Sequence, residues 1–272
     1  MPFDAKFYEK FAHYKVEEIE EGFAHVQLNN AKTLNAFAEQ DWQDYHEILT
    51  TLDADPDTNV ILVSSTVVKA FTSGLNLKEA MSTMGNTSGS LADRQKHLYN
   101  HIRDFQYCIG TPTRIRTPTI GLLNGINYGL ALDIAACFTI RVCTEDVKFS
   151  IREIKIGICA DIGSLQRLPS VVGNKSLLSQ YALTGEVWGH QQAVQLGFVS
   201  HVAKDLESGL QYCKDLGSDI NTNRQWAIKG TKDHLQRMYD GSSVAQGLED
   251  IAQYNSIHIT GDFVNDMAKV KL

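Results

Sequence analysis

The sequence predicts an α/β fold, because a buried strand, a glycine-containing turn and a helix recur along the chain. Residues 59–65 and 119–123 are short apolar runs of the kind that form buried strands. A turn follows each of them, one at Ser73-Gly74 and the other at Gly129. The recurrence predicts repeated ββα units wound into a spiral.

The N-terminal elements can be predicted from local patterns. Three phenylalanines, four residues apart in the first dozen residues, predict a short amphipathic helix. Residues 14–19 and 23–28 alternate on either side of a Glu-Glu-Gly turn, which predicts a β-hairpin. Residues 37–52 follow a helical pattern. Residues 81–90 are rich in serine, threonine and glycine, so we expect a loop over a pocket or a linker.

A long helix is expected over residues 91–107, and it carries His97 and His101 four residues apart. That spacing can bind a metal ion, but the glutamate of the metalloprotease motif is missing, so no metal site is expected. Residues 108–118 contain two prolines and are expected to be irregular.

The second half of the chain is predicted to become helical after Pro169. We expect an apolar helix at residues 130–137, an apolar segment at 138–143 and a strand at 147–151 before that point. The later helices are expected at residues 174–183, 190–196, 207–218, 224–239 and 244–259. The chain is therefore divided into a spiral core, residues 1–200, and a helical region, residues 201–272.

Size and composition narrow the functional classes. A chain of 272 residues can bury a full hydrophobic core. The net charge of −7 argues against a general nucleic-acid binder. The five cysteines are odd in number and contain no Cys-x-x-Cys pair, so we expect small buried side chains in a reducing compartment. No apolar run reaches membrane-spanning length, and the first residues do not form a secretory signal.

Residues 124–169 contain the candidate chemistry. A glycine turn ending at Gly129 leads into an apolar helix, and the unpaired N–H groups at a helix start can stabilise developing negative charge. Asp133 lies one turn into that helix, and Glu153 and Asp161 follow in an otherwise apolar stretch. Three acids grouped with such a turn indicate proton transfer next to a carbonyl.

Each acid also has a purely structural interpretation. Asp161 precedes an Ile-Gly-Ser sequence and could cap a helix. Glu153 follows Arg152 and could form a solvated ion pair. Asp133 lies among apolar residues, where a carboxylate needs a partner or a shifted pKa. The residues alone therefore establish only a pocket that contains carboxylates.

Specific motifs in the sequence resemble the crotonase (enoyl-CoA hydratase/isomerase) superfamily. Residues 71–77, FTSGLNL, and the turn at Gly129 resemble its two oxyanion turns, so the resemblance assigns the two N–H donors to Leu75 and Leu130 and substrate contacts to Ser73, Gly74 and Gly129. Residues 160–169, ADIGSLQRLP, and the three acids are similar to its dienoyl-CoA isomerases. Simple hydratases usually have glycine in place of Asp161, and fungal Δ3,Δ2-enoyl-CoA isomerases have an acid only there.

The resemblance implies an isomerase that shifts 3,5-dienoyl-CoA to 2,4-dienoyl-CoA in fatty-acid β-oxidation. In that scheme Glu153 acts at C2, Asp161 acts at C6, and Asp133 orients the diene or tunes its neighbours. No metal or redox cofactor is required, because the coenzyme A thioester acidifies its own α-proton. Lys32 and Lys78 are the candidates to bind coenzyme A. The C-terminal helices would cover the pocket and assemble a homotrimer or homohexamer.

Two alternatives stay open. An enoyl-CoA hydratase or Δ3,Δ2-enoyl-CoA isomerase would use part of the acid set, and a non-catalytic member would only bind a partner. Two departures from the superfamily pattern leave the width of the substrate open: Asn76 replaces its usual aspartate, and Leu130-Ala131 replace two of its glycines. The last residues, Val270-Lys271-Leu272, nearly match the Ser-Lys-Leu peroxisomal signal, so the peroxisome matrix and its import receptor are expected.

Overall fold

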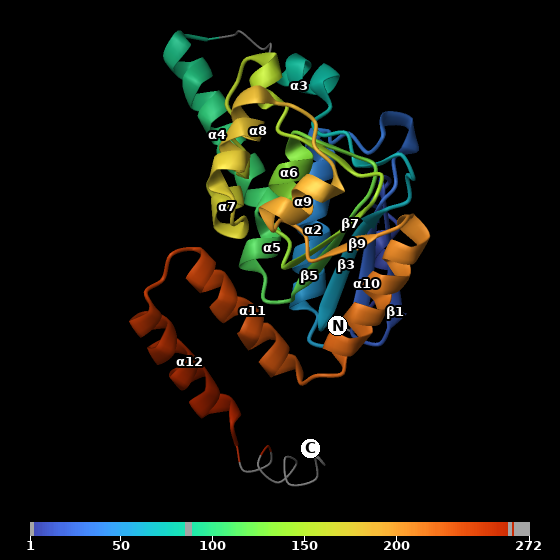
Figure 1. The fold of residues 1–272 in the computed structure, drawn as a ribbon, viewed down its shortest axis with the longest axis vertical. Coiled ribbons are helices and arrows are strands. Elements are labelled where there is room, and N and C mark those ends of the chain that lie inside the picture. The colour runs from blue at the N-terminus through green and yellow to red at the C-terminus, as the bar shows by residue number, and fades with distance from the viewer. Residues whose placement is uncertain (1–2, 85–88, 261–262, 264–272) are drawn as a thin grey trace.

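The computed structural model describes residues 3–84, 89–260 and 263. Its larger sheet has six strands in the order β1-β2-β3-β5-β7-β9 (Figure 1). The first two strands are antiparallel, and every later neighbour is parallel. The strands are β1 (Tyr14–Glu20), β2 (Phe23–Leu28), β3 (Val60–Ser65), β5 (Thr119–Leu123), β7 (Ile140–Thr144) and β9 (His201–Ala203).

A second sheet of three parallel strands confirms the predicted spiral. It contains β4 (Ala70–Thr72), β6 (Ile126–Tyr128) and β8 (Lys148–Ser150) in the order β4-β6-β8. Each turn of the chain thus gives one strand to the large sheet and the next strand to the small one. Helical segments follow each pair, and the β7–β8 pair adds a third unit to the two that the glycine turns predict.

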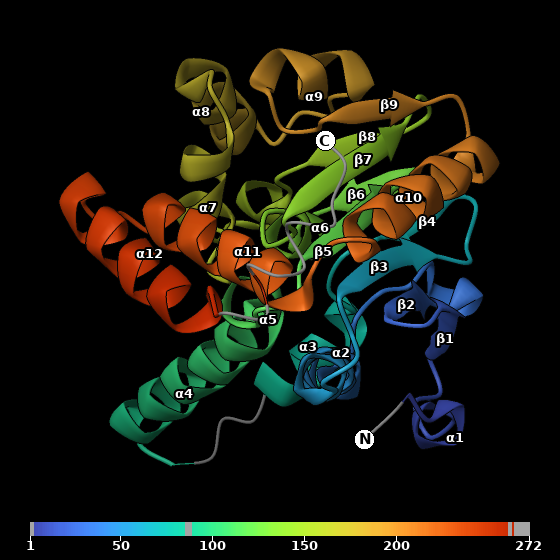
Figure 2. The same ribbon diagram turned by 90° about the horizontal axis from the view of Figure 1, so that it is seen from below.

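Helices cover both faces of the large sheet. The main core packs one face against α2 (Glu39–Ala54), α4 (Leu91–Ile109) and α6 (Leu130–Ala135). The amphipathic helix α10 (Leu206–Asn221) covers the other face, where Cys213 packs with strand residues such as Leu62 and Leu122 (Figure 2). Four of the five cysteines are buried as expected, but Cys159 is exposed.

The structure corrects several expected boundaries. The N-terminal helix is only α1 (Ala5–Tyr8), and α3 (Leu77–Met84) extends into the expected loop at 81–90, of which residues 85–88 lie outside the described part. A short helix, α5 (Thr111–Arg114), interrupts the expected irregular segment. Helix α7 (Ser164–Val171) begins before Pro169 and includes it, so the helical region starts earlier than predicted.

The C-terminal helices are of two kinds. Helices α8 (Lys175–Thr184) and α9 (His190–Leu196) lie on the body, and β9 and α10 pack with the large sheet although they follow the expected boundary at residue 200. Helices α11 (Gln225–Tyr239) and α12 (Val244–His258) form an antiparallel pair that projects away from the body (Figures 1 and 2). Among the described helices, none is long and apolar enough to cross a membrane.

The projecting pair is attached by specific contacts. Lys232 of α11 is buried, and its ammonium donates hydrogen bonds to the carbonyl oxygens of Thr113, at 3.0 Å, and Ile115. Tyr254 of α12 donates its hydroxyl to the carbonyl of Trp226, at 2.7 Å, and packs against Gly230. These contacts join α12 to α11 and α11 to α5.

Candidate active site

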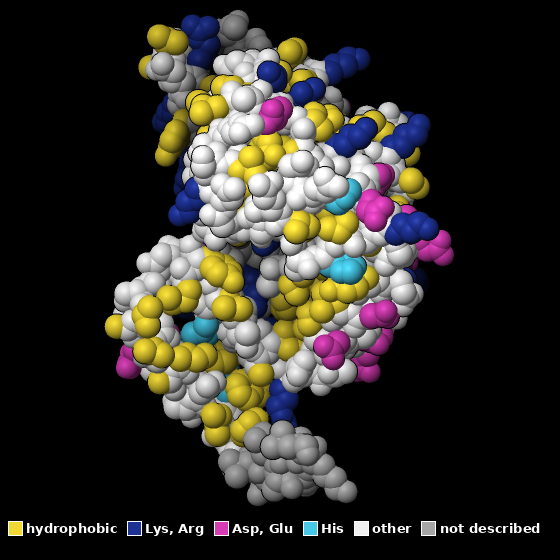
Figure 3. All heavy atoms as spheres, viewed as in Figure 1, with side chains coloured by type: hydrophobic (Ala, Val, Ile, Leu, Met, Phe, Trp, Pro, Cys, Tyr) yellow, Lys and Arg dark blue, Asp and Glu magenta, His cyan; other side chains and the backbone are white. Residues whose placement is uncertain are grey.

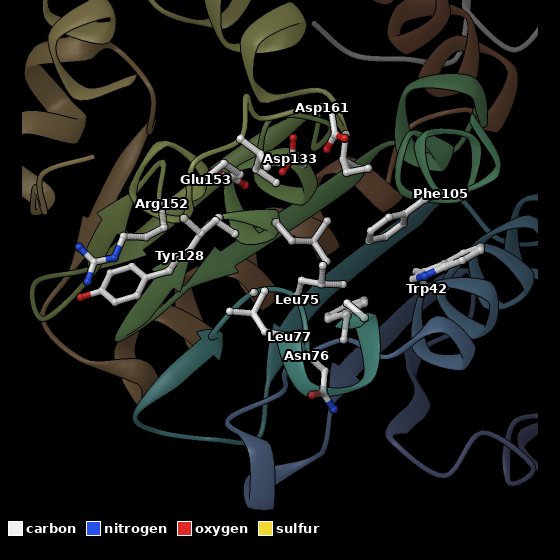
Figure 4. Close-up of a pocket in the computed structure, with 18 of the residues that line it drawn as sticks. Trp42, Leu75, Asn76, Leu77, Phe105, Tyr128, Asp133, Arg152, Glu153 and Asp161 are labelled. Atoms are coloured by element: carbon white, nitrogen blue, oxygen red, sulfur yellow. The ribbon is translucent and has the colours of Figure 1, made fainter. Parts of the chain in front are cut away.

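The three predicted acids meet in one cavity of about 550 Å³ beyond the C-terminal ends of the strands of the small sheet. Figure 4 shows Asp133, Glu153 and Asp161 along one side of it, with Trp42 and Phe105 at one end and Arg152 and Tyr128 at the other. Most of the lining is apolar, so a carboxyl group there is poorly solvated. The cavity is within the size range of small-molecule and cofactor sites.

Two glycine turns adjoin each other on the cavity wall. Gly74 has φ +102°, and a Cβ there would lie 2.5 Å from the carbonyl oxygen of Tyr128 and 3.7 Å from the amide nitrogen of Leu130. Only glycine fits this close approach. Within the described residues, the N–H groups of Leu75 and Leu130 have no hydrogen-bond acceptor. The predicted pair of N–H donors is therefore unpaired at the cavity.

Asp133 is the most buried of the three acids, with 1% of its surface exposed. Its carboxylate accepts a hydrogen bond from the backbone N–H of Ser164, at 2.5 Å, at the start of α7. Burial, and after it the nearby Glu153 carboxylate, raises the pKa of Asp133 to about 7. A carboxylate among apolar residues was expected to need a partner. For Asp133 that partner is the backbone N–H of Ser164, which lies 31 residues later in the chain.

Glu153 lies in the short helix η2 (Glu153–Ile156) and faces Gly129. A Cβ on Gly129 would come within 3.1 Å of its Oε1, so the glycine makes room for the carboxyl group. Its Oε2 is buried without a hydrogen-bond partner among the described residues. Burial raises the pKa of Glu153, and the Asp161 carboxylate raises it further. An unpartnered carboxyl oxygen with a raised pKa is suited to taking a proton from a ligand.

Asp161 does not cap α7, so the interpretation of Asp161 as a helix cap is ruled out. The N-cap residue is Gly163, and the side chain that accepts the first N–H of the helix belongs to Asp133. Asp161 instead lines the cavity, partly buried. Burial raises the pKa of Asp161, while its own backbone N–H and nearby His101 lower it.

The other predicted contacts divide into two groups. Ser73, Gly74 and Gly129 line the cavity. Lys32, in the short helix η1 (Ala31–Thr33), and Lys78, in α3, are exposed and lie outside the lining. Glu153 forms no ion pair with Arg152; the Arg152 guanidinium lies 5.1 Å from the ring centroid of Tyr128.

Sequence reasoning missed the aromatic end of the cavity. Trp42 of α2 stacks on Phe105 of α4 with ring centroids 5.0 Å apart, and His101 meets Trp42 edge-on at 6.0 Å. His101, Ile102 and Phe105 have the spacing of one helix face, which could have marked α4 as a wall. Their pairing with Trp42 depends on how α4 packs on α2, which no local pattern contains. No group of three or more potential metal ligands occurs in the described part of the chain.

Comparisons with known proteins agree with this geometry. A family model for enoyl-CoA hydratase/isomerase matches residues 18–262. The chain is 32% identical over 254 residues to a peroxisomal Δ3,5-Δ2,4-dienoyl-CoA isomerase of Arabidopsis thaliana, covering 91% of this chain and 89% of the relative. It is 32% identical over 232 residues to a mitochondrial Δ3,5-Δ2,4-dienoyl-CoA isomerase of Mus musculus, covering 85% of this chain and 70% of the relative.

Solved structures share the fold at lower identity. An enoyl-CoA hydratase from Shewanella pealeana superposes with a TM-score of 0.83 at 18% identity, covering 98% of this chain and 96% of the other. An enoyl-CoA hydratase from Bacillus anthracis gives a TM-score of 0.82 at 19% identity, covering 94% and 95%. The chain belongs to the enoyl-CoA hydratase/isomerase family, and its spiral of ββα units is the crotonase fold.

Proposed function

We propose that the protein is a Δ3,5-Δ2,4-dienoyl-CoA isomerase of fatty-acid β-oxidation. The observation that carries the proposal is the placement of Asp133, Glu153 and Asp161 in one apolar cavity beside two unpaired N–H groups. A diene shift needs an acid at each end of the conjugated system, and the cavity supplies them. The relatives from Arabidopsis thaliana and Mus musculus carry the name of this activity.

The reaction begins at C2 of the substrate. The Glu153 carboxylate takes a proton from C2, and the electrons of the broken C–H bond form C1=C2, which places the negative charge on the thioester oxygen. When the thioester carbonyl re-forms, these electrons make the C2=C3 double bond. The C3=C4 double bond moves to C4=C5, and C6 takes a proton from the Asp161 carboxyl group as C5=C6 is lost. Burial raises the pKa of both carboxyl groups, which favours proton transfer to and from them. A proton returned from Glu153 to Asp161 resets the site.

The thioester oxygen carries negative charge between the two proton transfers. The N–H groups of Leu75 and Leu130 would bind that oxygen, and removing one such donor typically costs about 3–4 kcal/mol of barrier. Asp133, held by the N–H of Ser164, would tune its neighbour Glu153, because the two carboxylates repel each other. This scheme needs no metal or redox cofactor, because the thioester itself acidifies the C2 proton.

The coenzyme A moiety would bind outside the cavity. Lys32 and Lys78 are exposed cations on η1 and α3, and both elements adjoin residues of the lining. Such exposed lysines can pair with phosphate without being buried. We therefore propose that Lys32 and Lys78 contact the coenzyme A phosphates.

Hydration of a 2-enoyl-CoA is the second candidate. Asp133 and Glu153 share the cavity and could position and deliver water. The feature that favours isomerisation is Asp161, which lies in the same cavity and makes no cap that would explain it structurally.

The test compares two substrates. The purified protein is mixed with a 3,5-dienoyl-CoA and, separately, with a 2-enoyl-CoA, and absorbance of the conjugated thioester is followed. We expect 2,4-dienoyl-CoA to form, with Glu153→Gln about 10²–10⁴-fold slower and the exposed control Glu186→Gln unchanged. Hydration of the 2-enoyl-CoA without isomerisation would assign the protein to the hydratases.

Assembly and location complete the proposal. Large apolar side chains are exposed along α11 and α12, so we propose that these helices join subunits into a trimer or hexamer. Figure 3 shows apolar atoms gathered on this projecting pair. We also propose the peroxisome matrix, through Val270-Lys271-Leu272, in line with the peroxisomal relative, although the relative from Mus musculus is mitochondrial. Deleting these three residues should abolish peroxisomal import of a tagged protein.

A further inference from the structure

Asp161 lies on a segment without regular secondary structure. Residues 157–163 connect η2 to α7 and include neither helix nor strand. A side chain on such a segment is not positioned by an element's own backbone hydrogen bonds, so other contacts must fix it. The carbonyl oxygen of Asp161 accepts a hydrogen bond from Nε2 of Gln106 at 2.6 Å.

Gln106 is itself well placed to hold this segment. It lies near the C-terminal end of α4, between the buried residues Phe105 and Cys108. Its Oε1 accepts a hydrogen bond from Nη1 of Arg103, at 3.0 Å, which orients the amide so that its NH₂ group faces Asp161. The same helix provides His101 and Phe105 to the cavity wall.

Glu153 is supported by different contacts. It begins η2, three residues after the last residue of β8, and its carbonyl oxygen accepts a hydrogen bond from the N–H of Ile158, in the connecting segment, at 3.2 Å. No hydrogen bond from Gln106 reaches η2 among the described residues. Gln106 therefore contacts the backbone of the acid assigned to C6 directly, and it reaches the acid assigned to C2 only through the chain between them.

We propose that Gln106 is a positioning residue for proton transfer at C6, holding Asp161 from α4 at the far end of the diene. This inference rests on the proposed isomerase function. Gln106 touches no reacting atom and acts through the Asp161 backbone. It thereby links the position of one acid to the helix that forms the aromatic end of the cavity.

The proposal predicts that the two proton transfers can be separated. Exchange of the C2 protons for deuterium needs only Glu153 and the two N–H donors, whereas isomerisation also needs Asp161 at C6. Small displacements of a catalytic group can cost up to about 100-fold in rate. Loss of the Gln106 contact should therefore slow isomerisation and spare exchange.

The experiment uses Gln106→Met, which keeps the side chain's length and removes its donor. Isomerisation of 3,5-dienoyl-CoA and deuterium exchange at C2 in D₂O are measured on the same protein. We expect isomerisation to fall about 10- to 100-fold and exchange to stay within about twofold. Gln95→Met is the matched control, since Gln95 lies exposed on the same helix and its side chain makes no hydrogen bond among the described residues. Asp161→Asn should show the same separation more strongly.

Other outcomes overturn the proposal in distinguishable ways. If Gln106→Met isomerises the diene at the unaltered rate, the positioning role is wrong and the proposed function stands. If isomerisation and exchange fall together, Gln106 has a general structural role instead. If the unaltered protein does not isomerise the diene at all, the proposed function fails and the positioning role fails with it.

Discussion

Three carboxyl groups line one cavity, and burial raises the pKa of each. The protonation of a single residue can therefore be detected as a change of protein stability with pH. Asp133 is the clearest case, because its folded-state pKa of about 7 lies above the ordinary value of 3.8. The folded protein therefore keeps this proton between about pH 4 and pH 7 while the unfolded chain loses it. By linkage, stability falls as the pH rises through that window, by about 4 kcal/mol in total for one group shifted this far.

The prediction is that Asp133→Asn weakens the fall of stability with pH. Asparagine does not ionise, yet its Oδ1 can still accept the N–H of Ser164. The free energy of unfolding, from urea titrations at pH 4 and pH 7, should therefore drop less in the variant than in the unaltered protein. Burial raises the pKa of Glu153 and Asp161 too, so part of the drop should remain. An equal drop in both proteins would show that Asp133 ionises normally.

Residue identity alone revealed much of the site but not all of it. Three acids in apolar sequence are conspicuous because an isolated buried carboxylate is costly. The partner of Asp133 and the support of Asp161 were not predictable, because a backbone N–H and an ordinary helical glutamine leave no pattern in sequence. Asp161 also resembled a helix cap until the structure placed Gly163 at that position.

At the scale of elements, the two glycine turns fix the oxyanion site. Gly74→Ala should place a Cβ 2.5 Å from the carbonyl oxygen of Tyr128 in a backbone conformation that alanine rarely adopts. The turn must then move, and the N–H of Leu75 moves with it. Steady-state assays should show kcat lower by about 10²–10³-fold, the effect of losing one oxyanion donor.

A glycine outside the site provides the control for that substitution. At Gly173 a Cβ would meet only the carbonyl oxygen of Leu196, at 4.0 Å, and φ is not positive. Gly173→Ala should therefore keep both stability and activity. If Gly74→Ala remains fully active, the turn at residues 73–75 does not supply a catalytic donor.

Elements with a strong local period were predicted well. The β1–β2 hairpin and the strands at 59–65 and 119–123 appear within about two residues of their expected bounds, because alternation and short apolar runs are local signals. Helix α3 was not predicted, and its last four residues fall in the segment that was expected to be a loop, where a serine and a threonine follow Met81. Helix α7 begins earlier than expected, because its first N–H is satisfied by a distant carboxylate and not by a neighbouring cap.

At the scale of the whole molecule, the notable feature is the exposed apolar surface of α11 and α12. No residue of α12 is buried, although it carries several large apolar side chains, including Val244 and Leu248. Exposed apolar surface of this kind supports the proposed assembly through these helices. The positions of these two helices along the chain were predictable from their helical periodicity. Their projection from the body was not predictable.

The assembly prediction can be tested by one charge on α12. Leu248→Asp should lower the molar mass measured by light scattering at micromolar concentration, because a carboxylate would be buried without a partner in the interface. Ser256→Asp, on an exposed polar position of the same helix, should leave the assembly intact. A monomer before any substitution would contradict the proposed trimer or hexamer.

The most direct test of the central claim is the activity of Asp161→Asn with a 3,5-dienoyl-CoA. Asp161 makes no helix cap, so its replacement should leave the melting temperature unchanged. The account predicts isomerisation slower by about 10²–10⁴-fold, as expected for loss of a proton-transfer group, while deuterium exchange at C2 continues. A variant that isomerises the diene at the unaltered rate would contradict the assignment of Asp161 to C6, and with it the proposed isomerase mechanism.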